Sequence, residues 1–338
     1  MKSFITICLF LFSLFAEEAT LISVNKIWDK DEYSAFPDII EYQNKFWVAF
    51  REANDHIGVH DGKVRILSST DGNTWNEETI LAKEGYDLRD PKFSLMPNGK
   101  LMLNMGGSRY DNGDVLFHSF IAFSSDGKNW SPLQQTNLKG EWVWRVEWLE
   151  DTGYGFSYRV SDPSDLKKPW VLSLFKTQDG TNYTLVKEFD ISKHPSEATV
   201  RFLKDKTMVA LLRRQGNGWI GQAKPPYTDF DWKDVGFPLG GPNFIVLPDG
   251  KMWAASRSYA LEGGKLILHT AVGPMTLTTY KPEFELPSLG DTSYPGLAYK
   301  DGILYVVYYS SHEQKTSIYL AKIKLAEKGS QDSVKQSP

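Results

Sequence analysis

Arginine recurs at one position of a repeated unit in this 338-residue chain. Each unit reads as a β-hairpin, and arginine follows the second strand of the first five: Arg51, Arg109, Arg159, Arg213 with Arg214, and Arg257. A guanidinium group makes planar two-point contacts with carboxylates, sulfates or phosphates. The pattern therefore indicates an anion-binding site. The alternative is structural ion pairing with acidic residues of the same hairpins: Asp38, Glu52, Asp90 and Glu147.

Polar residues also gather where the first strand of each hairpin begins. They are Asp38, Arg89 with Asp90, Arg145 with Glu147, Glu197, Asn243, and Ser293 with Tyr294; the last hairpin exits at His312. When hairpins are arranged in a ring, the innermost strands begin at one mouth of the central channel, and the second strands return to it. We therefore expect both sets of side chains to converge at that mouth.

The hairpins follow one another at intervals of about 50 residues, a spacing typical of propeller repeats. Each has two short runs rich in β-branched and aromatic residues around a turn such as Lys300-Asp301-Gly302. The six copies span residues 38–51, 91–105, 144–159, 199–213, 243–256 and 291–313. The repetition predicts an all-β propeller, with residues 17–326 forming one domain and residues 327–338 a disordered tail.

The strand at residues 19–28 has no hairpin partner of its own. In a ring of blades the first strand often completes the last blade, so we expect it to pair with residues 316–325 and close the ring. A composition of 41% hydrophobic and 14% aromatic residues suits many short, half-buried strands. The net charge of -4 argues against a nucleic-acid partner, and we expect a monomer.

Residues 1–16 have the features of a secretory signal peptide. Lys2 precedes an apolar run from Phe4 to Phe15, and the small residues Ser13 and Ala16 precede a plausible cleavage point. The run is shorter than the ~20 residues of a membrane-spanning helix, which disfavours a membrane anchor. Cys8, the only cysteine, lies in this segment. We therefore expect a secreted or periplasmic protein without a membrane span or disulfides.

A second motif follows the first three hairpins, at Ser69–Trp75, Ser124–Trp130 and Thr177–Tyr183. In each, an aromatic residue stands three positions after the glycine of an Asp-Gly pair. The Asp accepts backbone N–H groups, the Gly adopts a left-handed backbone, and the aromatic ring folds over the turn. Such residues stabilise turns and rarely catalyse, so we expect a structural role.

These features together resemble the exo-sialidases and related proteins with BNR, or Asp-box, repeats. The resemblance rests on the Asp-Gly turns and their spacing, on Glu197 and Arg213 at the two ends of one blade, and on Tyr294 at the start of the last. It implies a six-bladed propeller in which Tyr attacks the anomeric carbon, Glu takes its proton, Asp is the general acid and base, and three Arg bind the substrate carboxylate. Tyr294 then matches the nucleophile and Glu197 its base.

This pairing is chemically reasonable because a phenol is a weak nucleophile unless an adjacent carboxylate activates it. A neutral phenol also avoids repulsion with an anionic substrate, and tyrosine nucleophiles are a known exception among glycosidases. The alternative for Tyr294 is an aromatic ring that fills the channel. The alternative for Glu197 is an ion pair with Arg201, Arg213 or Arg214.

The resemblance places the general acid in the loop of residues 52–62. Asp61 fits best by its distance from Ser69, and Asp55 is the alternate. His56 and His60 beside them suit a loop that transfers protons, because histidine titrates near neutral pH. The spacing of these residues matches no closed metal site, and no cofactor is expected.

The chain departs from the family where the first arginine should be. The family's Tyr-Arg-Ile-Pro strand start is replaced by Ser34-Ala35-Phe36-Pro37, and no clear equivalent of the third arginine is present. Arg51, Arg89 and Arg257 would instead build a different anion clamp. The full set of predicted substrate-binding residues is Arg51, His60, Arg89, Arg213, Arg214, Asn243, Arg257 and His312.

Three functions fit these residues. The first is a secreted, retaining exo-glycosidase that removes a terminal acidic sugar from a glycan. The second is a polysaccharide lyase, in which arginine neutralises a uronate carboxylate and Tyr294 or a histidine removes the C5 proton. The third is a non-catalytic propeller that binds glycans, with stacking on some of the tryptophans Trp142, Trp144, Trp148, Trp219 and Trp253.

Overall fold

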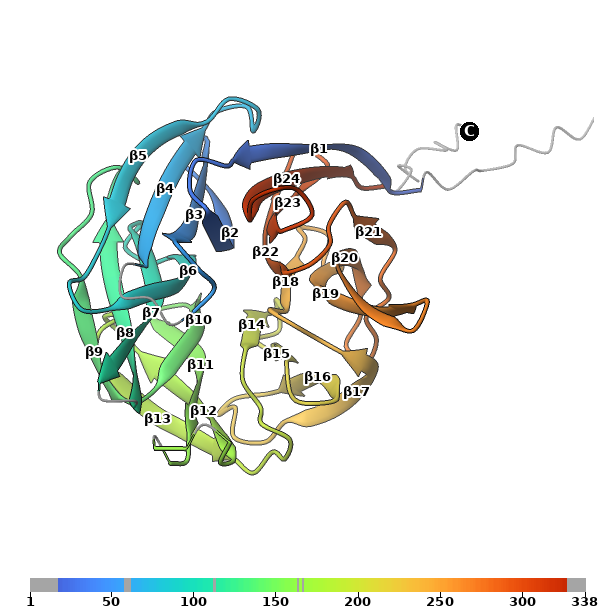
Figure 1. Ribbon diagram of the computed structural model, residues 1–338. Helices are drawn as coiled ribbons and strands as arrows, with labels where there is room; N and C mark the ends of the chain where they lie inside the picture. Colours follow the sequence, from blue (N-terminus) through green and yellow to red (C-terminus); the bar gives the residue numbers. More distant parts are fainter. Residues whose placement is uncertain (1–17, 58–61, 112–113, 163, 166, 327–338) are drawn as a thin grey trace, which may run out of the picture.

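The computed structural model describes residues 18–57, 62–111, 114–162, 164–165 and 167–326. Its strands form six antiparallel sheets of four strands each, arranged around a common centre (Figure 1). The predicted all-β, six-bladed propeller is therefore confirmed. The predicted signal peptide and C-terminal tail lie outside the described residues. Within the described ranges, no helix combines the length and apolarity needed to cross a bilayer.

The first three blades follow the chain from the inside of the ring outward. Blade 1 consists of β2 (Tyr33–Tyr42), β3 (Lys45–Ala53), β4 (Lys63–Ser69) and β5 (Asn76–Leu81). Blade 2 consists of β6 (Asp87–Leu95), β7 (Leu101–Asp111), β8 (Asp114–Ser124) and β9 (Gln134–Lys139). Blade 3 consists of β10 (Trp142–Leu149), β11 (Thr152–Val160), β12 (Trp170–Thr177) and β13 (Tyr183–Phe189).

The remaining blades have the same plan, except that the last takes its outer strand from the start of the chain. Blade 4 consists of β14 (Ala198–Phe202), β15 (Met208–Leu212), β16 (Asn217–Ala223) and β17 (Asp231–Pro238). Blade 5 consists of β18 (Asn243–Val246), β19 (Met252–Glu262), β20 (Lys265–Met275) and β21 (Phe284–Leu286). Blade 6 consists of β22 (Thr292–Lys300), β23 (Ile303–Ser310), β24 (Ser317–Lys324) and β1 (Thr20–Trp28).

Ring closure is made by β1, which pairs with β24 as the sequence predicted. The register runs from Thr20 opposite Lys324 to Trp28 opposite Ile318. A second link lies nearby, where the backbone N–H of Ser34 donates to the carbonyl of Thr316 at 2.9 Å. Hydrogen bonds between the two ends of the chain therefore hold blades 1 and 6 together.

The strands near the centre are buried on both faces because each lies between neighbouring blades. In β3 every residue except Lys45 is buried, whereas no residue of the outer strand β5 is. The large aromatic residues that fill the space between blades include Trp47, Phe50, Trp144, Phe156, Tyr308 and Tyr309. Burial of this apolar surface favours a closed ring over separate sheets.

The three Asp-Gly turns share one set of hydrogen bonds. In the first, Asp71 Oδ1 accepts the N–H groups of Asn73 at 2.8 Å and Thr74 at 2.9 Å. These bonds lower the pKa of Asp71 to about 2. A Cβ on Gly127, in the second turn, would lie 2.5 Å from the Trp47 ring of the preceding blade. The turns therefore pack against the neighbouring blade as well as joining two strands.

Candidate active site

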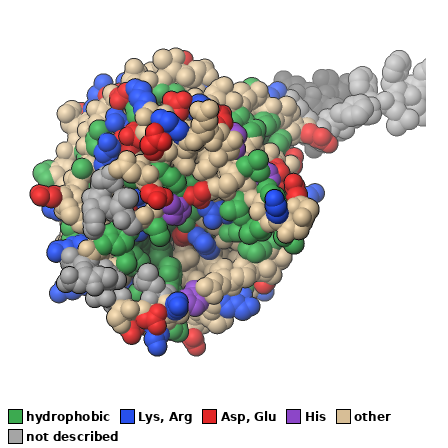
Figure 2. Space-filling view, viewed as in Figure 1, with side chains coloured by type: hydrophobic (Ala, Val, Ile, Leu, Met, Phe, Trp, Pro, Cys, Tyr) green, Lys and Arg blue, Asp and Glu red, His purple; other side chains and the backbone are tan. Residues whose placement is uncertain are grey.

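One cavity opens where the innermost strands begin. It encloses about 760 Å³, and all six blades contribute to its lining. One lining residue from each blade, in order, is Phe36, Asp90, Trp142, Glu197, Tyr259 and Tyr294. Figure 2 shows hydrophobic, basic and histidine side chains meeting near the middle of this face. The expected convergence is observed for part of each set: the strand-start residues Arg89, Asp90, Glu197 and Tyr294 and the strand-exit residues Arg213 and Arg214 line the cavity, and the other members do not.

A shared backbone feature aims three side chains into this cavity. Phe36, Asp90 and Tyr294 have φ angles of 57°, 53° and 51°, and each precedes a proline. At all three positions the pairing of the inner strand with its neighbour is interrupted by a β-bulge. A bulge redirects a side chain from the regular alternation of a strand, and such strained residues cluster at functional sites.

Tyr294 and Glu197 lie in direct contact, although they come from blades 6 and 4. The Tyr294 hydroxyl donates a 2.5 Å hydrogen bond to Glu197 Oε1. Arg213 Nη1 donates to the same carboxylate oxygen at 2.7 Å and to the Tyr294 hydroxyl at 3.1 Å. The other oxygen, Glu197 Oε2, accepts the backbone N–H of Gly241 at 2.8 Å. Both oxygens of Glu197 are therefore held in place.

The protonation states of this pair follow from burial and charge. Burial favours a higher pKa for Glu197, but Arg213 and the hydrogen bond from Tyr294 outweigh it, so the pKa lies below its ordinary value. Burial raises the pKa of Tyr294 well above its ordinary value, and the charge of Glu197 raises it further. At neutral pH a neutral phenol therefore faces a carboxylate.

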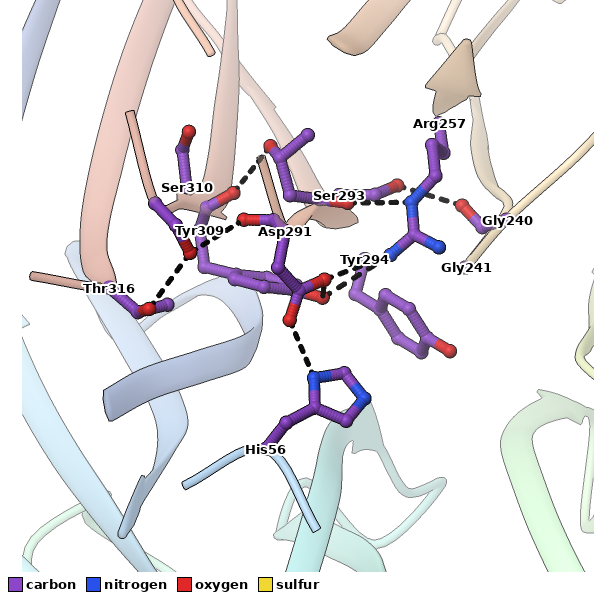
Figure 3. A network of polar contacts seen from close by, with 12 residues as sticks. His56, Gly240, Gly241, Arg257, Asp291, Ser293, Tyr294, Tyr309, Ser310 and Thr316 are labelled. Carbon is purple, nitrogen blue, oxygen red and sulfur yellow. Dashed lines mark hydrogen bonds and ion pairs between the residues drawn. The ribbon is translucent and has the colours of Figure 1, made fainter. Parts of the chain in front are cut away.

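The start of β22 is fixed from blade 5. Asn243 Nδ2 donates to the carbonyl oxygen of Pro295 at 2.9 Å, directly after Tyr294. The Ser293 hydroxyl donates to the carbonyl of Gly240 at 2.7 Å (Figure 3). Asn243 thus lies beneath the predicted site and positions the backbone next to Tyr294. It is not among the side chains that line the cavity.

A second polar network surrounds Asp291, just before Tyr294 (Figure 3). Asp291 Oδ2 contacts His56 Nδ1 at 2.5 Å and accepts a hydrogen bond from the Tyr33 hydroxyl. Its Oδ1 accepts a hydrogen bond from the Tyr309 hydroxyl at 2.8 Å. Burial favours a higher pKa for Asp291, but these hydrogen bonds and the nearby His56 lower the pKa to about 2. The network holds His56 at the cavity wall.

Three of the predicted arginines line the cavity: Arg89, Arg213 and Arg214. Arg89 Nη2 donates to Ser108 Oγ at 2.5 Å, and its guanidinium lies over the Trp142 ring. Arg214 lies 3.9 Å from the centroid of the Trp219 ring and donates to backbone carbonyls. These arginines are anchored by contacts beside the cavity.

Three other predicted residues do not line the cavity. Arg51 has no exposed surface, and its Nε donates to Asp87 Oδ1 at 2.7 Å. Arg257 Nε donates to the carbonyl of Thr292 at 2.8 Å. His312 contacts Ser310 Oγ at 2.8 Å. The structure therefore gives these three side chains structural partners behind the cavity wall.

The loop expected to carry the general acid is described only in part. Asp61 and His60 lie outside the described residues. Asp55 is exposed, and its Oδ1 accepts the backbone N–H of His56 at 2.6 Å. Among the described lining residues, the acidic ones are Glu197 and Asp90.

Two of the acidic residues considered as partners for the strand-exit arginines pair with other arginines instead. Asp38 accepts hydrogen bonds from both terminal nitrogens of Arg145, at 2.8 and 3.0 Å. Glu147 pairs with Arg201 at 3.1 Å. Arg145 and Arg201 come from strand interiors, whereas the exit arginine Arg213 faces the cavity. Ion pairing also includes exit arginines: Arg51, Arg159 and Arg257 pair with carboxylates away from the cavity lining, and Arg213 pairs with Glu197 in it.

Two features of the cavity were not included among the catalytic and substrate-binding residues predicted from the sequence. One is Asp90; the signal for it is an Asp-Pro pair at a strand start, matching Tyr294-Pro295. The other is a row of stacked rings on the blade 3 side, where Tyr158 lies parallel to Trp170, with ring centroids 5.3 Å apart at 6°. Trp142 continues the row beside Tyr158. Within the described residues, no group of three His, Cys, Asp or Glu side chains is placed to hold a metal ion.

Several solved structures resemble this chain. A protein of unknown function from Dyadobacter fermentans DSM 18053 matches with a TM-score of 0.75 and 16% identity, over 91% of this chain and 99% of that one. The Penicillium chrysogenum alpha-L-arabinanase complexed with arabinobiose matches with a TM-score of 0.65 and 14% identity, over 90% and 98%. Trypanosoma rangeli sialidase in complex with the inhibitor DANA matches with a TM-score of 0.61 and 11% identity, over 91% of this chain and 60% of the sialidase.

No protein-family model matches the chain, and no curated protein matches its sequence. At 11–16% identity the structural similarities show the architecture. The part of the resemblance that concerns the fold is confirmed: the chain is a six-bladed β-propeller of the sialidase type.

Proposed function

We propose that the protein is a secreted, retaining glycoside hydrolase that removes a terminal acidic sugar from a glycan. The observation that carries this proposal is the 2.5 Å hydrogen bond from Tyr294 to Glu197 inside the cavity. A phenol next to a carboxylate is an activated nucleophile, and both groups line the cavity. The proposed export of the protein rests on the sequence of residues 1–16.

In the proposed reaction, the Tyr294 oxygen attacks the anomeric carbon while its proton passes to Glu197. The bond from that carbon to the glycosidic oxygen breaks, and the departing oxygen takes a proton from an Asp general acid and leaves as an alcohol. The neutral phenol approaches an anionic sugar without charge repulsion, and Arg213 stabilises the negative charge that develops on the phenol oxygen. Water then attacks the same carbon and gives one proton to the ionised Asp, the bond from the sugar to Tyr294 breaks, and Tyr294 recovers its proton from Glu197. Two displacements at one carbon retain the anomeric configuration.

The preference for an acidic sugar rests on the charges at the cavity. Arg89, Arg213, Arg214 and Lys167 line it, against the two carboxyl groups of Glu197 and Asp90. This local excess of positive charge contrasts with the net charge of -4 for the whole chain. Arginine binds carboxylates in a planar, two-point geometry, so a sugar carboxylate suits this wall.

The solved structures of similar shape support a carbohydrate substrate. They include a sialidase in complex with sialic acid and an alpha-L-arabinofuranosidase in complex with arabinobiose. One of these proteins acts on an acidic sugar and the other on a neutral sugar, although they share one architecture. The sugar that this protein recognises must therefore be identified by experiment.

The test is a screen of the purified protein against 4-methylumbelliferyl glycosides of sialic, ulosonic and uronic acids, with the glucoside and arabinofuranoside as neutral controls. We expect turnover of an acidic glycoside, with the anomeric configuration retained in the first-formed product by NMR. Turnover of neutral glycosides alone would refute the preference for acidic sugars. Absence of turnover across the panel would refute the proposed hydrolase.

A second candidate is a lyase acting on uronic-acid glycans. It is favoured by His56, whose imidazole lies at the cavity wall with Nδ1 held by Asp291 at 2.5 Å. A histidine oriented by a carboxylate is a suitable base for removing the C5 proton of a uronate. The product distinguishes the two reactions, because a lyase leaves an unsaturated sugar that absorbs ultraviolet light and a hydrolase does not.

A further inference from the structure

Asp90 is a buried carboxyl group at the cavity wall with an unsatisfied oxygen. Its residue is 7% exposed, and among the described residues Oδ1 has no hydrogen-bond partner. Nearly all buried polar atoms in proteins are hydrogen-bonded, so an exception requires an explanation. Because Asp90 also lines the cavity, a bound ligand is a natural partner for this oxygen.

The backbone directs Asp90 into the cavity in the same way as Tyr294. Both residues have positive φ, 53° and 51°, both precede a proline, and both lie at a bulge in an innermost strand. This conformation costs most residues with a Cβ about 1–2 kcal/mol, and aspartate and asparagine adopt it more readily. The third residue of this kind, Phe36, packs its ring 5.0 Å from the ring of Tyr294. The same strained geometry therefore presents a phenol and a carboxyl group to one space.

The charges around Asp90 come from three blades. Lys92 and Arg89 lie on the same strand, Glu197 comes from blade 4 and His56 from blade 1. Burial raises the pKa of Asp90 to about 6, although the two cations on its strand act in the opposite direction. Glu197 raises this pKa and His56 lowers it, so both lie within electrostatic range of Asp90. A carboxyl group that titrates near pH 6 both donates and accepts protons under mild conditions.

We propose that Asp90 is the general acid and base of the reaction at this site; the proposal rests on the proposed glycosidase function. In the first step the Asp90 proton moves to the glycosidic oxygen as its bond to the anomeric carbon breaks. The Tyr294 oxygen forms the new bond to that carbon and gives its proton to Glu197. The aglycone leaves as an alcohol, and Asp90 is left ionised.

In the second step Asp90 takes a proton from water. The water oxygen bonds to the anomeric carbon, the bond to Tyr294 breaks, and Glu197 returns the proton to the phenol. All three side chains regain their starting states, and the net reaction is hydrolysis. The two steps balance with water as the only co-reactant.

Two rival assignments make different predictions. Asp90 as a binding group would accept a hydrogen bond from a sugar hydroxyl, and its loss would slow all substrates equally. If Asp61 is the acid, the loss of activity in Asp90→Asn would not depend on the leaving group. Protonation matters most when the departing group is a poor one, so the dependence on leaving group identifies the acid.

The experiment compares wild type, Asp90→Asn and Asp61→Asn on two series of substrates. One is glycosyl fluorides, from which fluoride departs without protonation; the other is galactose-linked disaccharides. Both series carry N-acetylneuraminic, ulosonic and uronic acids. For Asp90→Asn we expect a loss of about 10²–10⁴-fold in kcat/KM on the disaccharide and a far smaller loss on the fluoride. The alkaline limb of its pH profile should disappear, and azide should yield a glycosyl azide. Thermal melting checks folding, and asparagine tolerates the same backbone conformation.

Each outcome has a defined meaning. Equal losses on fluoride and disaccharide would overturn the role of Asp90 and leave the glycosidase intact. Dependence on the leaving group in Asp61→Asn instead of Asp90→Asn would assign the acid to Asp61. If wild type turns over neither series, the proposed function fails, and the role of Asp90 fails with it.

Discussion

Gly241 lies against Tyr294 so closely that a Cβ at position 241 would be 2.6 Å from the Tyr294 Cγ. The same glycine donates its backbone N–H to Glu197 at 2.8 Å. It also has a φ of 57°, a conformation that side chains rarely adopt. One residue without a side chain therefore sets the positions of both the proposed nucleophile and its base.

Gly241→Ala should lower kcat/KM by about 10²-fold or more, because a displacement of about 1 Å at a reacting group has an effect of that size. The matched control is Gly250→Ala, since Gly250 also has positive φ (86°) but a Cβ there would meet no atom within 4 Å. Both variants should melt at lower temperatures than wild type. Equal activity in the two would show that the contact with Tyr294 is unimportant.

Tyr294→Phe should abolish turnover with little change in thermal melting. Glu197 keeps its contacts to Arg213 and Gly241, so the loss of one hydrogen bond should cost about 1 kcal/mol. Tyr308→Phe is the control, because it removes a buried hydroxyl bonded to the Pro287 carbonyl outside the cavity. It should keep its activity. A Tyr294→Phe variant that still turns over substrate would exclude the nucleophile assignment.

Trp170→Ala tests whether the stacked rings bind the part of the substrate beyond the acidic sugar. Trp170 and Tyr158 present parallel rings at the cavity, a surface suited to the face of a sugar. We expect KM to rise about tenfold for a disaccharide, equivalent to ~1.4 kcal/mol, with kcat nearly constant. A glycosyl fluoride has no second sugar, so its KM should change far less. A similar change in KM for the disaccharide and the fluoride would show that the second sugar does not bind at these rings.

Asp90→Asn should be more stable than wild type at pH 7. The folded pKa of about 6 lies above the ordinary value of 3.8, so wild type loses stability as the pH rises from about 4 through 6. Asparagine does not titrate and escapes this loss, which is at most ~3 kcal/mol at 1.36 kcal/mol per pKa unit. Urea denaturation at pH 4 and pH 7 measures it. A variant less stable than wild type at pH 7 would contradict the raised pKa.

Asp291→Asn should show the opposite sign. The folded pKa of Asp291, about 2, lies below the ordinary value of 3.8, so its contribution to stability is present above pH 4 and is lost as the pH falls toward 2. The variant should therefore be less stable than wild type at pH 7, with the difference shrinking in acid. The same denaturation series carried to pH 2.5 provides the measurement. A difference that is constant with pH would exclude the proposed linkage.

The fold followed from the sequence because its signals are local and repeated. Each hairpin has its own turn chemistry, and the unpaired strand at residues 19–28 indicates how the ring closes. The contact between Tyr294 and Glu197 was predicted from the resemblance to sialidases, since 97 residues separate them. Neither hydropathy nor spacing reports a contact over such a distance.

The sequence did not distinguish arginines that face the cavity from those that support it. Arg51 and Arg213 occupy equivalent strand exits, yet Arg51 is completely buried against Asp87 and Arg213 lines the cavity. Arg51 pairs with Asp87 of the neighbouring blade, whereas Arg213 pairs with Glu197 at the start of its own blade. Asp90 was noted at a strand start, but its unsatisfied oxygen is a property of three-dimensional packing alone.

Pairing of β1 with β24 also sets the order of events during synthesis. Residues 20–28 leave the ribosome before the rest of the ring, but their partner at residues 317–324 is made after the other described strands. At about 5–20 residues per second, the first strand waits roughly 15–60 s for its neighbour. During that interval the nascent chain exposes an open strand edge, which is covered only when residues 317–324 have been translated.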